Sequence, residues 1–334
     1  MDLPPPQVIR AVVQRYARLL ERYSGDIGDR PFVLPTGEYF PDRYKGDETS
    51  VEVLTTRMQS HAGMADIPIT CRVVSPDGET QNLGNCSSGA CSVPQTGTGL
   101  ARLVDEGESW TLQIPAPELK HPVALTTNLA RSLAFIFLVE TQKDGETFEP
   151  PVEVTADFIA VALGFGALML QGSYIYTKSC GGPQIARVTS MGVSELAIAV
   201  ALFAELGGHK ASGVAGALGI TQREAFKEAL RLVRGNKDLL QRLSRDPSRV
   251  AREDLHLLSP NAVLSGVLRK FRRASERPSS PFDFDEELNL EDVESLLMEM
   301  PPSSRAGRKK SVALDPQKEE IKSLVADVLS ESRL

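Results

Sequence analysis

The sequence is short of the residues that build disulfide frameworks and metal centres. Its 334 residues include four cysteines and four histidines. Four cysteines in a chain of this length do not make a disulfide framework. Cys86 and Cys91 are separated by four residues, which is not the spacing of a zinc ribbon or a thioredoxin site. We expect reduced thiols in a loop there, with a local disulfide or half of a metal site as the alternatives. Cys180 has no neighbour in sequence that would activate it as a nucleophile.

Signals for phosphate binding and for export are also missing. No Walker A loop or dinucleotide fingerprint follows a predicted strand. The first residues lack the basic and apolar regions of a secretory signal, so we expect a cytoplasmic protein. Residues 158–176 carry no charge and approach the length of a membrane span. They contain several glycines and are not flanked by Lys or Arg at both ends, so we interpret them as a buried core helix and expect no membrane span.

The remaining composition is that of a soluble globular protein, with 41% apolar and 24% charged residues. Alternating apolar residues predict strands at 67–74 and 110–114. Apolar residues at helical spacing predict helices at 8–23, 51–62, 123–140, 154–175, 194–206, 222–234, 237–243 and 261–271. The fold class expected from this order is α+β, mostly helical, with a small N-terminal sheet. We expect three parts: an α+β subdomain (1–120), a helical subdomain (121–275) and a flexible tail (276–334).

Residues 129–157 have the spacing of a metal site without its usual residues. Zincin-type metallopeptidases carry His-Glu-x-x-His on one helix, where two imidazoles one turn apart bind zinc and the Glu activates a water. In gluzincins, a Glu on the next long helix is the third ligand, and an Asp four residues later orients a ligand His. Here, Arg131 and Phe135 stand at the positions of the two His, and Ser132 stands at that of the catalytic Glu. Glu153 and Asp157 match the third ligand and the orienting Asp.

Two further segments extend this resemblance. Leu34-Pro-Thr-Gly-Glu-Tyr-Phe-Pro-Asp42 and Ala162-Leu-Gly-Phe-Gly166 are similar to runs that flank the metal helix and the third ligand in a group of bacterial zincin-like proteins. The resemblance covers about residues 32–233. It implies a zincin-like core for this chain.

The substitutions at the centre of the motif exclude its chemistry. Phe cannot bind a metal, Arg stays protonated and repels one, and Ser cannot replace the Glu base. We therefore expect no metal, no cofactor and no catalysis there. Buried carboxylates are costly without a counter-charge, so we expect Arg131 to pair with Glu153 or Asp157. The alternative is that these are two ordinary amphipathic helices whose first-turn acids are favoured by the helix dipole.

Residues 212–234 resemble a helix-turn-helix, with Ala215 as the small residue of the first helix and Gly219 in the turn. Residues 210–273 hold fourteen Lys/Arg against six Asp/Glu. The side chains available for DNA phosphates would be Arg223, Lys227, Arg231 and Arg234. Glycines in the first helix, and Glu224 and Glu228 on the second, oppose this interpretation. We favour a helical hairpin that closes the domain and keep DNA binding as the alternative.

The tail carries the strongest remaining pattern. Residues 282–300 contain eight acidic residues and no basic one. The apolar residues expected to contact a partner are Phe282, Phe284, Val293, Leu296, Leu297 and Met300, and in residues 317–329 they are Ile321, Leu324, Val325 and Val328. Such segments dock as helices in protein grooves; folding back onto the chain's own basic helices, or a solvated tail, are alternatives.

The function expected from the sequence is that of a non-catalytic pseudoenzyme, a cytoplasmic interaction or regulatory protein whose tail recruits a protein partner. One alternative is a DNA-binding regulator that uses residues 212–234. The other is a hydrolase with an unrecognised site.

Overall fold

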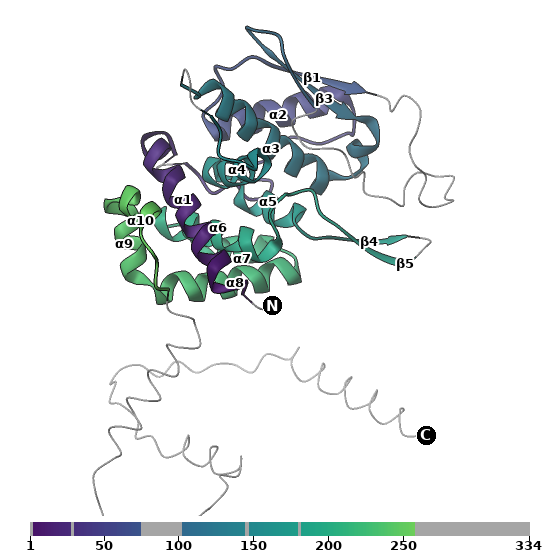
Figure 1. Ribbon diagram of the computed structural model, residues 1–334. Coiled ribbons are helices and arrows are strands. Elements are labelled where there is room, and N and C mark those ends of the chain that lie inside the picture. The colour runs from purple at the N-terminus through teal and green to yellow at the C-terminus, as the bar shows by residue number, and fades with distance from the viewer. Residues whose placement is uncertain (1–2, 28–29, 75–101, 144–146, 180–181, 258–334) are drawn as a thin grey trace, which may run out of the picture. The chain divides into compact units, whose positions relative to one another are not determined.

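The computed structural model describes residues 3–27, 30–74, 102–143, 147–179 and 182–257 (Figure 1). Contacts divide the chain into two units, Met1–Ser275 and Glu276–Leu334. The described residues all belong to the first unit, which is mostly helical with two small sheets. The expected helix at 261–271, the tail segments 282–300 and 317–329, and Cys86, Cys91 and Cys180 lie outside the described residues.

Helices α1 (Pro6–Ile27) and α2 (Glu48–Ala62) match the helices expected near the N-terminus. Helix α2 begins at a capping box, because the Asp47 side chain accepts from the Ser50 N–H at 2.8 Å and the Ser50 hydroxyl accepts from the Asp47 N–H at 3.1 Å. It ends at Gly63, whose φ of 64° is the left-handed conformation that glycine adopts without strain. These local signals define both ends of α2.

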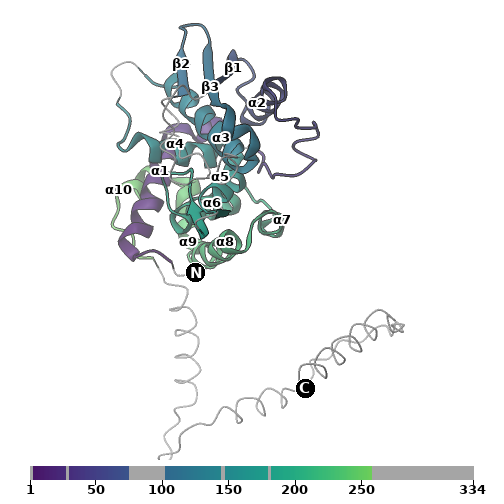
Figure 2. The ribbon, with the colours of Figure 1, turned by 90° about the vertical axis from the view of Figure 1, so that its right-hand side faces the viewer.

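A three-stranded sheet lies at one end of the unit (Figures 1 and 2). Its strands are β1 (Ile69–Val74), β2 (Leu103–Asp105) and β3 (Trp110–Pro115). The central strand is β3, which pairs with β1 in parallel and with β2 antiparallel. The 3-10 helix η2 (Ala116–Lys120) then leads from β3 to the first core helix. The carboxylate of Glu118 in η2 is fully buried; it accepts from Arg102 Nη1 at 2.5 Å and from the Asn128 amide.

The core contains helices α3 (Pro122–Glu140), α4 (Val152–Ala160), α5 (Gly166–Gly172) and α6 (Val193–Leu206). The sequence predicted one helix over 154–175, and this was wrong in detail. A five-residue π-helical segment, η3 (Val161–Phe165), separates α4 from α5, and the helix ends at Gly172. The cause is Gly164, which has φ of +96° and whose carbonyl accepts from the Val33 N–H at 2.9 Å.

Residues 175–186 form a β-hairpin, which the sequence analysis missed. Strands β4 (Ile175–Ser179) and β5 (Gly182–Ala186) pair antiparallel. The hairpin projects from the helices in Figure 1. Tyr176 and Ile185 face each other in the register and are 54% and 63% exposed. Aromatic and β-branched residues before a Gly-Gly pair were the available signal.

The last described helices are α7 (Ala211–Ala217), α8 (Ile220–Gly235), α9 (Lys237–Arg245) and α10 (Pro247–Arg252). Helix α8 packs on α6, and α10 packs on α1. Ion pairs join the two ends of the described chain: Arg10 to Asp254 at 2.8 Å and Arg252 to Glu21 at 3.0 Å. The N-terminal helix is therefore part of the helical core and not of the sheet layer.

Two stretches are long and apolar enough to cross a membrane by length and composition, Pro122–Glu140 and Val152–Gly172. Within them, 72% and 78% of the most apolar window is buried inside the fold. Core helices of soluble proteins pass the same test.

We predict that Gly164→Ala destabilises the protein. A Cβ at this position would lie 2.1 Å from the Pro31 carbonyl oxygen, and the backbone would stay at a positive φ. The strain alone is worth about 1–3 kcal/mol, so a lower urea midpoint is expected. Gly216→Ala is the control, since a Cβ there meets nothing within 4 Å and α7 gains helix propensity of about 0.5–1 kcal/mol. Equal midpoints for both variants would contradict the close approach at Gly164.

Candidate functional site

The centre of the predicted metal frame is occupied by an ion pair between α3 and α4. Arg131 Nε donates to Asp157 Oδ1 at 2.7 Å, and the two side chains are 7% and 0% exposed. The hypothesis that Arg131 pairs with Glu153 or Asp157 is therefore confirmed, with Asp157 as the partner. Both residues come from the middle of their apolar helices, so the pair lies within the core.

Both members of the pair have further partners from one loop. Arg131 Nη1 donates to the Val188 carbonyl and Nη2 to the Ser190 hydroxyl, each at 2.8 Å. Asp157 Oδ2 accepts from the backbone N–H groups of Ser190 at 2.7 Å and Met191 at 2.8 Å. Each guanidinium nitrogen and each carboxylate oxygen is thus hydrogen-bonded, which is the condition under which a buried ion pair is tolerated.

Burial raises the pKa of the Asp157 carboxyl above its ordinary value, and the Arg131 charge and the two backbone amides oppose that rise. The carboxylate therefore depends on Arg131 for its charge. The loop 188–191, which follows β5, was not among the residues singled out in the sequence. Its sequence has no local pattern that predicts hydrogen bonds to a buried ion pair.

The other three frame residues do not form a reactive group. The Ser132 hydroxyl is buried and has no hydrogen-bond partner, so no base is positioned to activate it. Phe135 is half-buried, with its ring centroid 6.5 Å from that of Phe148. Glu153 lies in the first turn of α4 and is half-buried. Within the described part of the chain, Glu153 has no ion pair or hydrogen bond, so the structure brings together only two of the five predicted residues.

Metal-binding groups of three or more His, Cys, Asp or Glu are not found among the described residues. Cys71 is the cysteine that the structure describes. Its thiol is buried and lies 3.2 Å from the Thr55 hydroxyl, and burial raises its pKa. A thiol with a raised pKa has little of the thiolate form that acts as a nucleophile or ligand.

The helix-turn-helix-like segment exists as α7 and α8, but its basic side chains are engaged within the protein. Arg223 donates to the carbonyls of Ala215 and Leu218, both at 2.8 Å, and so caps the end of α7. Lys227 pairs with Glu224, Arg231 with Glu228 and Arg234 with Glu205. These pairings reduce the positive charge available for phosphates and agree with the favoured interpretation, a helical hairpin.

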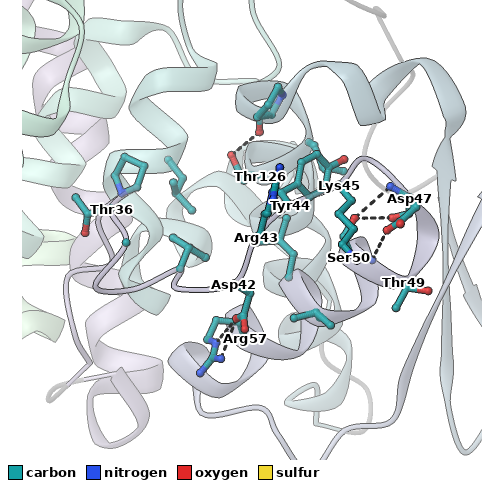
Figure 3. Close-up of a pocket in the computed structure, with 18 residues that line it drawn as sticks. Thr36, Asp42, Arg43, Tyr44, Lys45, Asp47, Thr49, Ser50, Arg57 and Thr126 are labelled. Atoms are coloured by element: carbon teal, nitrogen blue, oxygen red, sulfur yellow. Dashed lines mark hydrogen bonds and ion pairs between the residues drawn. The ribbon is translucent and has the colours of Figure 1, made fainter.

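A cavity of about 700 Å³ lies elsewhere in the unit, and neither Arg131 nor Asp157 lines it (Figure 3). Its walls come from residues 35–57, from the first turns of α3 and from Leu168 of α5. None of the five frame residues lines it. Residues 34–42, which carry part of the resemblance to zincin-like proteins, supply part of the wall.

Comparisons with protein-family models, with curated proteins and with solved structures found no match to this chain. The resemblance to zincin-like proteins therefore remains a prediction from the sequence.

We predict that Arg131→Met and Asp157→Asn each lower the free energy of unfolding by about 3–5 kcal/mol, because each leaves a buried partner without its counter-charge. The double variant is expected to lose less than the sum of the two, measured by urea unfolding. Arg57→Met is the matched control. It breaks an Arg–Asp pair of nearly the same length, 2.8 Å to Asp42, that is exposed to solvent, and it should cost about 0.5 kcal/mol. Additive losses in the double variant would show that the two charges are not coupled.

Proposed function

We propose that this chain is a non-catalytic pseudoenzyme, a cytoplasmic interaction or regulatory protein built on a zincin-like core. The observation that carries the proposal is the position of Arg131 and the hydrogen bonding of its guanidinium group. It stands where the resemblance expects the first zinc ligand, and its three guanidinium nitrogens are held by Asp157, Val188 and Ser190. A permanent cation in that position repels a metal ion and offers no base.

The layout of the elements supports a zincin-like core. The sheet directly precedes α3, which carries the degenerate motif, and Glu153 and Asp157 lie on the next helix. The run at 34–42 and the run at 162–166, which carry part of the resemblance, belong to segments that meet through the Val33–Gly164 hydrogen bond. In this arrangement, the guanidinium of Arg131 supplies to Asp157 the positive charge that a metal and its ligand would supply.

The partner is proposed from the tail sequence. Residues 282–300 combine a fully acidic charge pattern with apolar residues at helical spacing, and residues 317–329 repeat the apolar spacing. This combination is typical of segments that bind in a groove of another protein. The function of the core is then to present or to regulate the tail, with no reaction of its own.

Restoring the His-Glu-x-x-His motif at residues 131–135 tests whether the core is zincin-like. The triple variant Arg131→His, Ser132→Glu, Phe135→His is expected to bind one zinc per chain and to gain thermal stability on zinc addition. The unmodified protein is expected to bind no stoichiometric zinc and to keep its Tm in a chelator. The measurements are elemental analysis and thermal unfolding with and without zinc.

Glu153→Ala in the triple variant is the control, because it removes the expected third ligand and should weaken zinc binding by about 10-fold or more. A triple variant that folds, by circular dichroism, yet binds no zinc would contradict the zincin-like frame. That outcome would not contradict the proposal that there is no catalysis at Arg131.

Partner recruitment is tested in the full-length chain. Leu296→Asp adds a charge to the apolar stripe and is expected to remove the co-purifying partner. Ser295→Asp adds the same charge about 100° away on a helix and is expected to retain it. Co-purification followed by mass spectrometry gives the result. Recovery of the same proteins with both variants would show that this stripe is not the recruiting element.

A further inference from the structure

The 700 Å³ cavity has a charge arrangement that its immediate surroundings do not neutralise. Five charged side chains line it: the cations Arg43, Lys45 and Arg57, and the carboxylates of Asp42 and Asp47. Arg57 Nη2 lies 2.8 Å from Asp42, so these two form a pair. Asp47 is used in the α2 capping box, and its charge lies near Lys45.

Arg43 and Lys45 are left as two exposed cations. Across the described residues, neither has a carboxylate oxygen within ion-pair distance. In Figure 3, they lie with Tyr44 in the middle of the close-up, between the Asp42–Arg57 pair and the Asp47–Ser50 cap. With three cations and two carboxylates in its lining, the cavity carries one excess positive charge, which favours an anionic group over a neutral or cationic one.

The wall behind these cations is apolar. Its accessible apolar surface comes from Val53, which is 41% exposed, and from the half-buried Phe40 and Leu54, with the buried Leu125 and Leu168 beneath them. Thr126 adds a hydroxyl, which donates to the Pro122 carbonyl at 2.9 Å and is thus committed to its own helix. A cavity of this size can enclose a small molecule, since ligand sites typically measure about 300–1,000 Å³.

We propose that this cavity binds a small amphipathic anion, with its acidic head at Arg43 and Lys45 and its apolar body against Phe40, Val53 and Leu54. The site is separate from the Arg131–Asp157 pair and goes beyond the proposed interaction function. The hydroxyl and carboxylate of its lining that lie together, Ser50 and Asp47, are committed to the α2 capping box, so the ligand is bound and not converted. Burial of the apolar body supplies most of the affinity, and the two cations select the sign of the head group.

The probe for this site is the fluorescent anion 8-anilinonaphthalene-1-sulfonate, titrated into the full-length protein at low salt. We expect saturable binding at one site per chain. Arg43→Gln with Lys45→Gln should weaken it by about 10-fold, and added salt should weaken binding to the unmodified protein in the same direction. Octanoate should displace the probe, and octylamine should not.

Two further variants test whether the probe binds in this cavity. Val53→Glu adds a negative charge to the cavity wall at a side chain that is already 41% exposed, and it should weaken binding by a similar factor. Lys237→Gln removes an exposed cation that lies outside the cavity, and it should change binding by less than about twofold. Circular dichroism establishes that each variant is folded.

The proposal is overturned if neither the probe nor octanoate binds saturably, if the Arg43/Lys45 double variant binds as well as the unmodified protein, or if octylamine displaces the probe as well as octanoate does. These outcomes are independent of the zinc and tail experiments, since no variant is shared between them.

Discussion

The described fold depends on a buried charge that must be neutralised within the protein. Arg131 and Asp157 face each other between α3 and α4, where the surrounding side chains are apolar. Removing either charge from water costs several kcal/mol, and only the pairing and its hydrogen bonds offset that cost. The loop 188–191 supplies most of those hydrogen bonds, so α3, α4 and the start of α6 are held in one arrangement.

A second constraint acts directly after α4, at Gly164. The chain at 31–33 passes so close to Gly164 that the helix must open into a π-helical segment to receive it. Side chains before and after that segment consequently point in directions that an uninterrupted helix would not give. The charge pair fixes α4 against α3, and the glycine allows the loop that walls the cavity to enter the core.

Local signals in the sequence were enough to predict most of the described helices and two of the strands, because periodicity acts over a few residues. Helix α10 was not predicted, and α2 begins three residues before the predicted start. The pairing of Arg131 was predicted from its position opposite two acids. The choice of Asp157 over Glu153 was not, since it depends on the N–H groups of Ser190 and Met191, more than thirty residues away. The break at Gly164 and the cavity at Arg43 likewise depend on segments that meet only after folding. The hairpin at 175–186 had a local signal, but the adjacent apolar run was read as a continuous helix.

The hairpin begins and ends at fixed points. The Val188 N–H donates to the Gly172 carbonyl at 2.8 Å, directly behind β4 and β5, and the Val188 carbonyl is itself a partner of Arg131. One residue, Val188, therefore both closes the base of the hairpin through its N–H and satisfies Arg131 through its carbonyl. The exposed hairpin and the buried charge pair share this attachment point.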